Sequence, residues 1–179
     1  MIRIRALAMF CFVAALVAAT ANASAGDEQA FINLFAGSWA GSATVIKNAV
    51  PWQVSCRVVG TPAPNHITIE GNCSLSIISV RIAADITYDP KSGRYSGTYI
   101  GAEAGPARVS GRRNGNVLNL AITWPRPING DTRARMTIEN GGAGSLRMTT
   151  FDNVVSGGPE VRTSDAGLTV AAGSLVAGR

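Results

Sequence analysis

Few residues of this 179-residue chain have the types and spacing that catalysis requires. His66 is its one histidine, and no Gly-x-Ser-x-Gly element supplies a nucleophile for a Ser-His-Asp arrangement. The carboxylates that a general acid–base pair would need fall on different predicted strands and loops: Glu70, Asp85, Glu103, Asp131 and Glu139. The sequence therefore predicts no catalytic residue and no cofactor, and an enzyme is the least favoured function.

Two of the three cysteines, Cys56 and Cys73, flank a predicted turn over Thr61–Asn65. In a hairpin centred at Pro64-Asn65 they stand opposite one another, and the Cα separation of about 4.5–5.5 Å across antiparallel strands suits a disulfide. No Cys or His pair has the spacing of a metal site, so no metal ligand is predicted. A redox pair needs closer spacing and a cationic setting. We therefore expect a structural disulfide.

Aromatic side chains on the predicted strands are the remaining candidates for binding. Inside a barrel they can line a pocket for a small hydrophobic or amphipathic molecule. The candidate pocket residues are Tyr88, Tyr95, Tyr99, Trp124, Leu120 and Met136. The alternative is that they fill the interior as ordinary core, and the sequence does not separate the two. Arginines on neighbouring strands, such as Arg94, Arg108 and Arg133, are expected to point mostly outward, because a buried unpaired charge is unfavourable.

The N-terminus has the order of an export signal. Arg3 and Arg5 precede an uncharged apolar run, Ala6–Ala19, and two overlapping small-x-small cleavage sites follow at residues 21–25. Residues 1–25 are thus predicted to be a signal peptide, and the remaining chain to be periplasmic or secreted, where disulfides persist. No later apolar stretch is long enough for a transmembrane helix.

Charge and length describe the remainder. The chain has 16 Lys and Arg residues; without Arg3 and Arg5, 14 basic residues face 11 acidic ones, a net charge of +3. This bias is too weak to indicate a nucleic-acid partner. The 154 residues after position 25 (179 less 25) are a typical length for one domain.

The hydrophobic pattern after the signal changes from helix to strand. Asp27 caps a short helix predicted over Asp27–Phe35, whose apolar residues recur at helical spacing. From there the alternation has a period of two, broken by turns such as Asp89–Gly93 and Asn114-Gly115. Nine strands are predicted: Trp39–Lys47, Trp52–Val59, His66–Leu75, Val80–Tyr88, Arg94–Ile100, Ala107–Arg112, Val117–Trp124, Asp131–Glu139 and Ser145–Phe151.

Short connections without a crossover helix place each strand beside its neighbours in sequence. Because open sheet edges invite aggregation, such a meander closes or folds into two layers. The predicted fold is all-β: an antiparallel up-and-down β-barrel of eight to ten strands with a short N-terminal helix. The barrel domain is predicted over residues 26–155. A Gly/Ala-rich segment, 156–179, follows and is expected to be mobile, although Leu168–Val170 could form one more strand.

The junction between helix and first strand resembles a known family. Phe35-Ala-Gly37-Ser-Trp39 is similar to the Gly-x-Trp entry of lipocalins and the wider calycin superfamily, in which the tryptophan closes one end of the barrel. The resemblance implies a calycin-type barrel with Trp39 as its closure, packed against a late-strand arginine such as Arg147 or Arg162. The Thr-Asp-Tyr signature of lipocalins is absent.

Two functions remain in view. The first is an exported barrel that binds a small hydrophobic or amphipathic ligand. The alternative is a protein-binding barrel, such as a protease inhibitor or an envelope-associated structural protein. The chain also resembles small periplasmic metalloprotease inhibitors of bacteria, which share the Gly-x-Trp entry and a single disulfide and inhibit through a free N-terminal segment. A hollow interior favours the first function, and a filled interior favours the second.

Overall fold

A computed structural model describes residues 25–101 and 104–171. The predicted signal up to residue 24, the candidate carboxylate Glu103 and the C-terminal residues 172–179 lie outside the described part. Among the described helices, none is long and apolar enough to span a bilayer.

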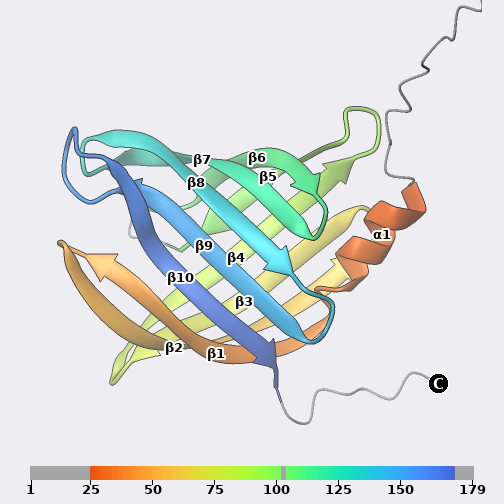
Figure 1. The fold of residues 1–179 in the computed structure, drawn as a ribbon, viewed down its shortest axis with the longest axis horizontal. Coiled ribbons are helices and arrows are strands. Elements are labelled where there is room, and N and C mark those ends of the chain that lie inside the picture. The colour runs from red at the N-terminus through yellow and green to blue at the C-terminus, as the bar shows by residue number, and fades with distance from the viewer. Residues whose placement is uncertain (1–24, 102–103, 172–179) are drawn as a thin grey trace, which may run out of the picture.

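One helix and ten strands make up the described chain (Figure 1). The helix is α1 (Ala25–Asn33). The strands are β1 (Gly37–Lys47), β2 (Val50–Ala63), β3 (His66–Leu75), β4 (Ile78–Asp89), β5 (Arg94–Ile100), β6 (Ala107–Asn114), β7 (Val117–Ile128), β8 (Asp131–Asn140), β9 (Ser145–Asn153) and β10 (Glu160–Val170). Each pairs antiparallel with the next, and β1 also pairs with β10, which closes the barrel. The predicted fold class is confirmed, at the upper end of the predicted strand number.

The closing strand, β10, lies in the C-terminal segment that the sequence-based boundary at residue 155 left outside the barrel. It pairs with β1 from Trp39↔Val170 to Val45↔Ser164, and with β9 along its other edge. The barrel therefore extends to Val170, and the strand is longer than the predicted Leu168–Val170. Small residues of weak strand propensity and a register shift between Arg162 and Ser164 hide the alternation in the sequence.

Alternate side chains of each strand point into the barrel and fill it. In β7, Leu118, Leu120 and Ile122 are buried, whereas Asn119 and Ala121 between them are exposed. The same alternation in the other strands produces one continuous core cluster that runs from α1 through the barrel. The interior is therefore packed with side chains.

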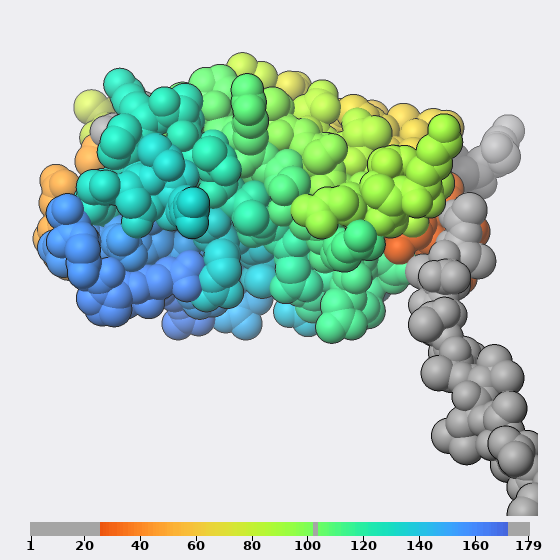
Figure 2. Space-filling view, turned by 90° about the horizontal axis from the view of Figure 1, so that it is seen from above, coloured from red at the N-terminus to blue at the C-terminus, as the bar shows by residue number. Residues whose placement is uncertain are grey.

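Helix α1 covers one end of the barrel (Figures 1 and 2). Its apolar side chains Phe31 and Ile32 are buried, together with Phe35 just after the helix. The helix begins two residues before the predicted Asp27. It ends two residues before the predicted Phe35, because the chain tightens after Asn33 into i→i−3 hydrogen bonds.

Trp39 lies at this covered end. Only 3 % of its surface is exposed, and its indole N–H donates to the Phe35 carbonyl at 3.1 Å. Gly37, between the two, has a φ of +115°, a left-handed conformation that favours glycine and turns the chain from α1 into β1. From the far side, the Asn140 side chain donates to the Leu34 carbonyl at 2.8 Å, which ties the β8–β9 turn to the helix.

The two candidate arginine partners of Trp39 have other contacts. Arg147 and Arg162 both bind Asp165, at 2.7 Å and 2.9 Å, and both are exposed. Neither ion pair involves Trp39, so the contact implied by the lipocalin resemblance is replaced by the hydrogen bond to the Phe35 carbonyl.

The predicted disulfide is present. Cys56 of β2 and Cys73 of β3 are directly opposite in register, with their Cα atoms 4.0 Å apart. Cys56 is buried and Cys73 is half-buried. The bond joins β2 to β3 on the inner side of the barrel wall.

Reducing this disulfide should lower the free energy of unfolding by about 3 kcal/mol, because the unfolded chain regains the entropy lost in closing a loop. The loop spans a sequence separation of 17 residues. Guanidinium unfolding with and without reductant measures the difference. The double variant Cys56→Ala/Cys73→Ala is the control, since reductant should leave its midpoint unchanged. An unchanged midpoint in the reduced natural chain would contradict the expected loop contribution.

Replacing Trp39 with Ala should cost about 3–5 kcal/mol of stability, because it removes a large buried side chain and its hydrogen bond at the covered end. Thermal unfolding followed by circular dichroism measures this. Trp52→Ala is the matched control, because Trp52 is an exposed tryptophan on β2 and should change stability little. Equal effects of the two substitutions would show that Trp39 does not close the barrel.

Candidate binding site at the barrel mouth

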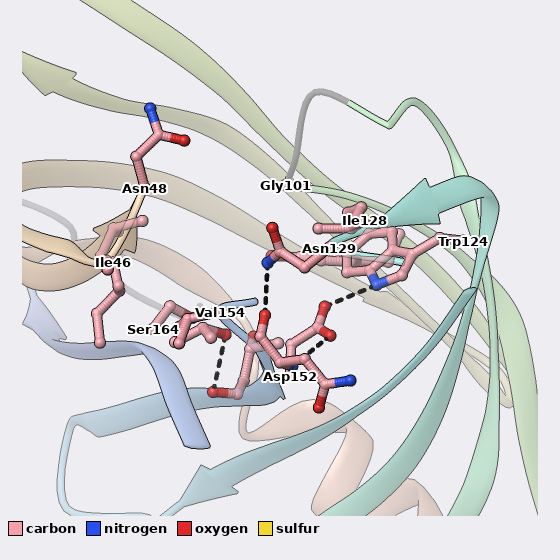
Figure 3. Close-up of a pocket in the computed structure, with 15 residues that line it drawn as sticks. Ile46, Asn48, Gly101, Trp124, Ile128, Asn129, Asp152, Val154 and Ser164 are labelled. Atoms are coloured by element: carbon pink, nitrogen blue, oxygen red, sulfur yellow. Dashed lines mark hydrogen bonds between the residues drawn. The ribbon is translucent and has the colours of Figure 1, made fainter. Parts of the chain in front are cut away.

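The end of the barrel opposite α1 is the mouth, where the β1–β2, β3–β4, β5–β6, β7–β8 and β9–β10 connections meet (Figure 1). A pocket of about 130 Å³ opens there. Fifteen residues line it, drawn from β1, β5, β7, β9, β10 and the turns beside them (Figure 3). Core side chains fill the barrel below it.

Asp152 and Trp124 form the polar centre of this pocket (Figure 3). Asp152, from β9, is only 5 % exposed, and its Oδ2 accepts the indole N–H of Trp124 from β7 at 3.0 Å. Its Oδ1 accepts the backbone N–H of Asn153 at 2.7 Å. A carboxylate has about four lone-pair sites. Acceptor positions on Asp152 therefore remain for a further donor.

The charge of Asp152 has no cationic partner among the described residues that line the pocket, since none of them is Lys or Arg. Burial raises the pKa of Asp152, and the neighbouring carboxylates Asp131 and Glu160 raise it further, against the opposing effect of its two N–H donors. The nearby Arg135 is engaged by Glu160 at 2.6 Å. The mouth thus contains a buried acid with an unmet preference for a cation or a hydrogen-bond donor.

Tyr99 adds an aromatic wall and a hydroxyl group to the pocket. Its ring lies 6.2 Å from that of Trp124, between centroids. Burial raises the pKa of Tyr99 to about 12, so the phenol stays neutral and can donate. Its hydroxyl makes no hydrogen bond to a described residue and lies against Gly101, where an added Cβ would collide with it. The pocket therefore combines an acceptor, a donor and two aromatic faces, which are features of small-molecule sites.

The structure separates the six predicted pocket residues. Tyr99 and Trp124 line the mouth pocket, while Leu120 and Met136 are buried in the packed interior. Tyr88 and Tyr95 contact one another at 4.9 Å, and Tyr95 also packs on Phe31 of α1. Tyr88 and Tyr95 therefore belong to the covered end. Arg94, Arg108 and Arg133 are exposed, so no arginine from this set faces the interior.

A second buried acid, Glu28 of α1, lies at the covered end and has a cationic partner. Its Oε2 accepts the Tyr95 hydroxyl at 2.5 Å and the Arg113 guanidinium at 2.9 Å. Arg113 also lies over the ring of Phe31, 5.0 Å from its centroid. This network attaches α1 to β5 and β6, so its role is structural. Asp152 at the mouth differs in having no such cation.

Asp152 was not among the predicted site residues, because it lies one residue beyond the predicted strand, which ended at Phe151. The inward alternation of Leu146, Met148 and Thr150 continues to Asp152, so one more residue of strand would have revealed it. Two asparagines of the rim were also missed. Asn129 donates to the carbonyl of Asn153, and the side-chain amide of Asn153 donates to Asp131, so they connect the β7–β8 and β9–β10 turns.

The fold of this chain is similar to that of a solved structure, although its sequence matches no known family. No protein-family model matches the chain, and no curated protein sequence matches it. Among solved structures, the crystal structure of Rv2717c from M. tuberculosis superposes with a TM-score of 0.58 and 15 % sequence identity, over 78 % of this chain and 94 % of that one. The two proteins share a fold. The likeness is one of fold, and it agrees with the closed ten-strand antiparallel topology of this chain.

Proposed function

We propose that this chain is an exported binding barrel that holds a small molecule in its mouth pocket. The observation that carries the proposal is the buried Asp152 carboxylate, oriented by Trp124 and without a cation among the described residues around it. A charge in this position is unfavourable for folding, because burial penalises its ionised form. A ligand that donates a hydrogen bond to the carboxylate, or carries a positive charge, would offset that penalty.

The ligand class follows from volume and chemistry. A pocket of about 130 Å³ is smaller than the roughly 300–1,000 Å³ of sites for drug-sized ligands. It suits a compact ring or the head of a larger molecule that extends out of the mouth. With Asp152 as acceptor and Tyr99 and Trp124 as aromatic walls, an aromatic ring that bears an alkylammonium group fits better than an anion-headed amphiphile.

The packed interior of the described barrel gives no deep cavity and by itself favours the protein-binding alternative, so the ligand proposal depends on the mouth pocket alone. At the helix end that alternative has less support. A metalloprotease inhibitor of the kind considered above acts through a free N-terminal segment. Here the residues that follow the predicted cleavage site form α1, whose Glu28 is bound to Tyr95 and Arg113. To act as a free inhibitory segment, α1 would have to break the hydrogen bonds of Glu28 to Tyr95 and Arg113.

Small aromatic probes of matched shape test the ligand class: benzylamine, benzyl alcohol and benzoate. We expect benzylamine to bind most tightly, with a change in the fluorescence of Trp124 and shifts in the NMR signals of the mouth residues. Asp152→Asn should weaken its binding about 10- to 100-fold, because an interaction with a charged group is lost. In the natural chain its affinity should fall as the pH drops through the raised pKa of Asp152.

Two controls accompany this experiment. Asp85→Asn removes an exposed carboxylate elsewhere and should leave probe binding unchanged. Asp152→Asn keeps one oxygen for the Trp124 N–H but leaves the Asn153 N–H without its acceptor, while above the raised pKa it removes a charge that disfavours the folded state. Thermal unfolding at pH 7 therefore checks that the variant is folded. Equal benzylamine binding by Asp152→Asn and the natural chain would reject the ligand class, and no probe binding at the mouth would reject the function.

Export is tested separately by sequencing the N-terminus of protein recovered from the periplasm or the medium. The expected start lies between residues 24 and 26, directly before or within the first turn of α1. Recovery of the protein only from the cytoplasm, with Met1 intact, would contradict it.

A further inference from the structure

Large exposed apolar side chains gather at the mouth. Nine are exposed in the described part of the chain, and six of them lie at this end: Val50, Trp52, Ile77, Ile78, Val80 and Val155. Of the other three, Leu34 and Val170 lie near the covered end and Val59 lies on the side of β2. Single exposed apolar residues are ordinary, but a cluster at one end marks an interaction surface.

Five of these residues form what we call the apolar rim: Val50, Trp52, Ile77, Ile78 and Val80. They lie on the β1–β2 and β3–β4 hairpin tips, which project at the left of Figure 1, at the end opposite α1; Figure 2 shows the β1–β2 tip at that same end.

Strand pairing explains why the apolar rim is exposed. Pairing of β1 with β10 stops at Val45, and pairing of β2 with β3 stops at Ser55, so the two tips extend beyond the closed barrel. Trp52 continues the alternation of the buried Cys56 and Val58, and Val80 that of the buried Ala84. These positions belong to the inward set, but each lacks a neighbouring strand on one side: β3 does not reach Trp52, and β5 does not reach Val80. Ile77 is 97 % exposed, Ile78 64 % and Trp52 46 %.

The charges on the tips and on the strands directly below them have one sign. Over residues 45–57 and 73–82 the charged residues are Lys47, Arg57 and Arg81, and there is no Asp or Glu. All three basic residues are exposed, although Arg81 also contacts Glu70 farther along β3. The apolar rim therefore has basic residues beside it, a combination that suits a negatively charged, partly apolar partner.

We propose that the apolar rim docks on a membrane surface that contains anionic lipids, with the β1–β2 and β3–β4 tips toward the lipid. Tryptophan and aliphatic side chains at projecting tips enter the headgroup region, and nearby Lys and Arg are attracted to anionic headgroups. Two separate tips fit a deformable lipid interface better than the close, continuous packing that a protein interface requires. This inference goes beyond the proposed ligand site and does not depend on it.

Flotation with lipid vesicles tests the proposal. The chain is used from residue 25 onward, because the apolar run Ala6–Ala19 would itself enter lipid, and every described element lies within residues 25–171. We expect binding to phosphatidylcholine vesicles that contain phosphatidylglycerol, and weaker binding to phosphatidylcholine alone or at high salt. Trp52 is exposed, whereas Trp39 and Trp124 are buried, so a blue shift of the tryptophan fluorescence would report insertion of Trp52 into lipid.

The double variant Ile77→Ser/Ile78→Ser should reduce the vesicle-bound fraction about tenfold. Leu34→Ser, at the covered end, is the matched control and should bind vesicles like the natural chain. Circular dichroism and thermal unfolding check that both variants are folded. No binding to anionic vesicles, or equal binding by the double variant, would overturn the proposal. A concentration-dependent dimer that the double variant abolishes, without vesicle binding, would assign the apolar rim to self-association and overturn it as well.

Discussion

Pairing between the first and last strands is the constraint on which the rest of the structure depends. β1 is hydrogen-bonded to β2 on one side and to β10 on the other, so the described barrel has no open strand edge. Closure determines which side chains face inward, and it gives the molecule two distinct ends. At one end it provides the ring of strands that α1 covers. At the other it brings Thr163 and Ser164 of β10 beside β1 and β9, where they complete the wall of the mouth pocket.

The two ends show how the same chemical group serves structure or binding according to its neighbours. Glu28 and Asp152 are both buried carboxylates that accept a hydrogen bond from an aromatic side chain, Tyr95 and Trp124 respectively. Glu28 also has Arg113, which balances its charge and attaches the helix. Asp152 has instead two other carboxylates in its field. A buried charge that the fold leaves uncompensated indicates a position where an outside molecule supplies the missing partner.

Local and pairwise patterns in the sequence predicted most of the fold. The opposition of Cys56 and Cys73 across a proline turn was sufficient for the disulfide, and regular alternation predicted β1 to β9. β10 was harder because the shift after Arg162 breaks its period. The site was predicted only in part. Aromaticity selected Tyr99 and Trp124, but it could not separate them from Tyr95, because burial is common to pocket and core. Asp152 depended on where a strand ends, the least certain feature of any sequence pattern.

The closing contact also has a consequence for how the molecule folds. Trp39 pairs with Val170, so the last seam of the barrel joins residues from opposite ends of the domain. Contacts of such long sequence separation form slowly, since a long loop must be ordered before they are made. Until β10 emerges, β1 and β9 are each left with an open edge. If the chain crosses a membrane from its N-terminus, β1 cannot pair with β10 until the C-terminal strand has also crossed. The barrel would therefore close only after the whole chain is on the far side.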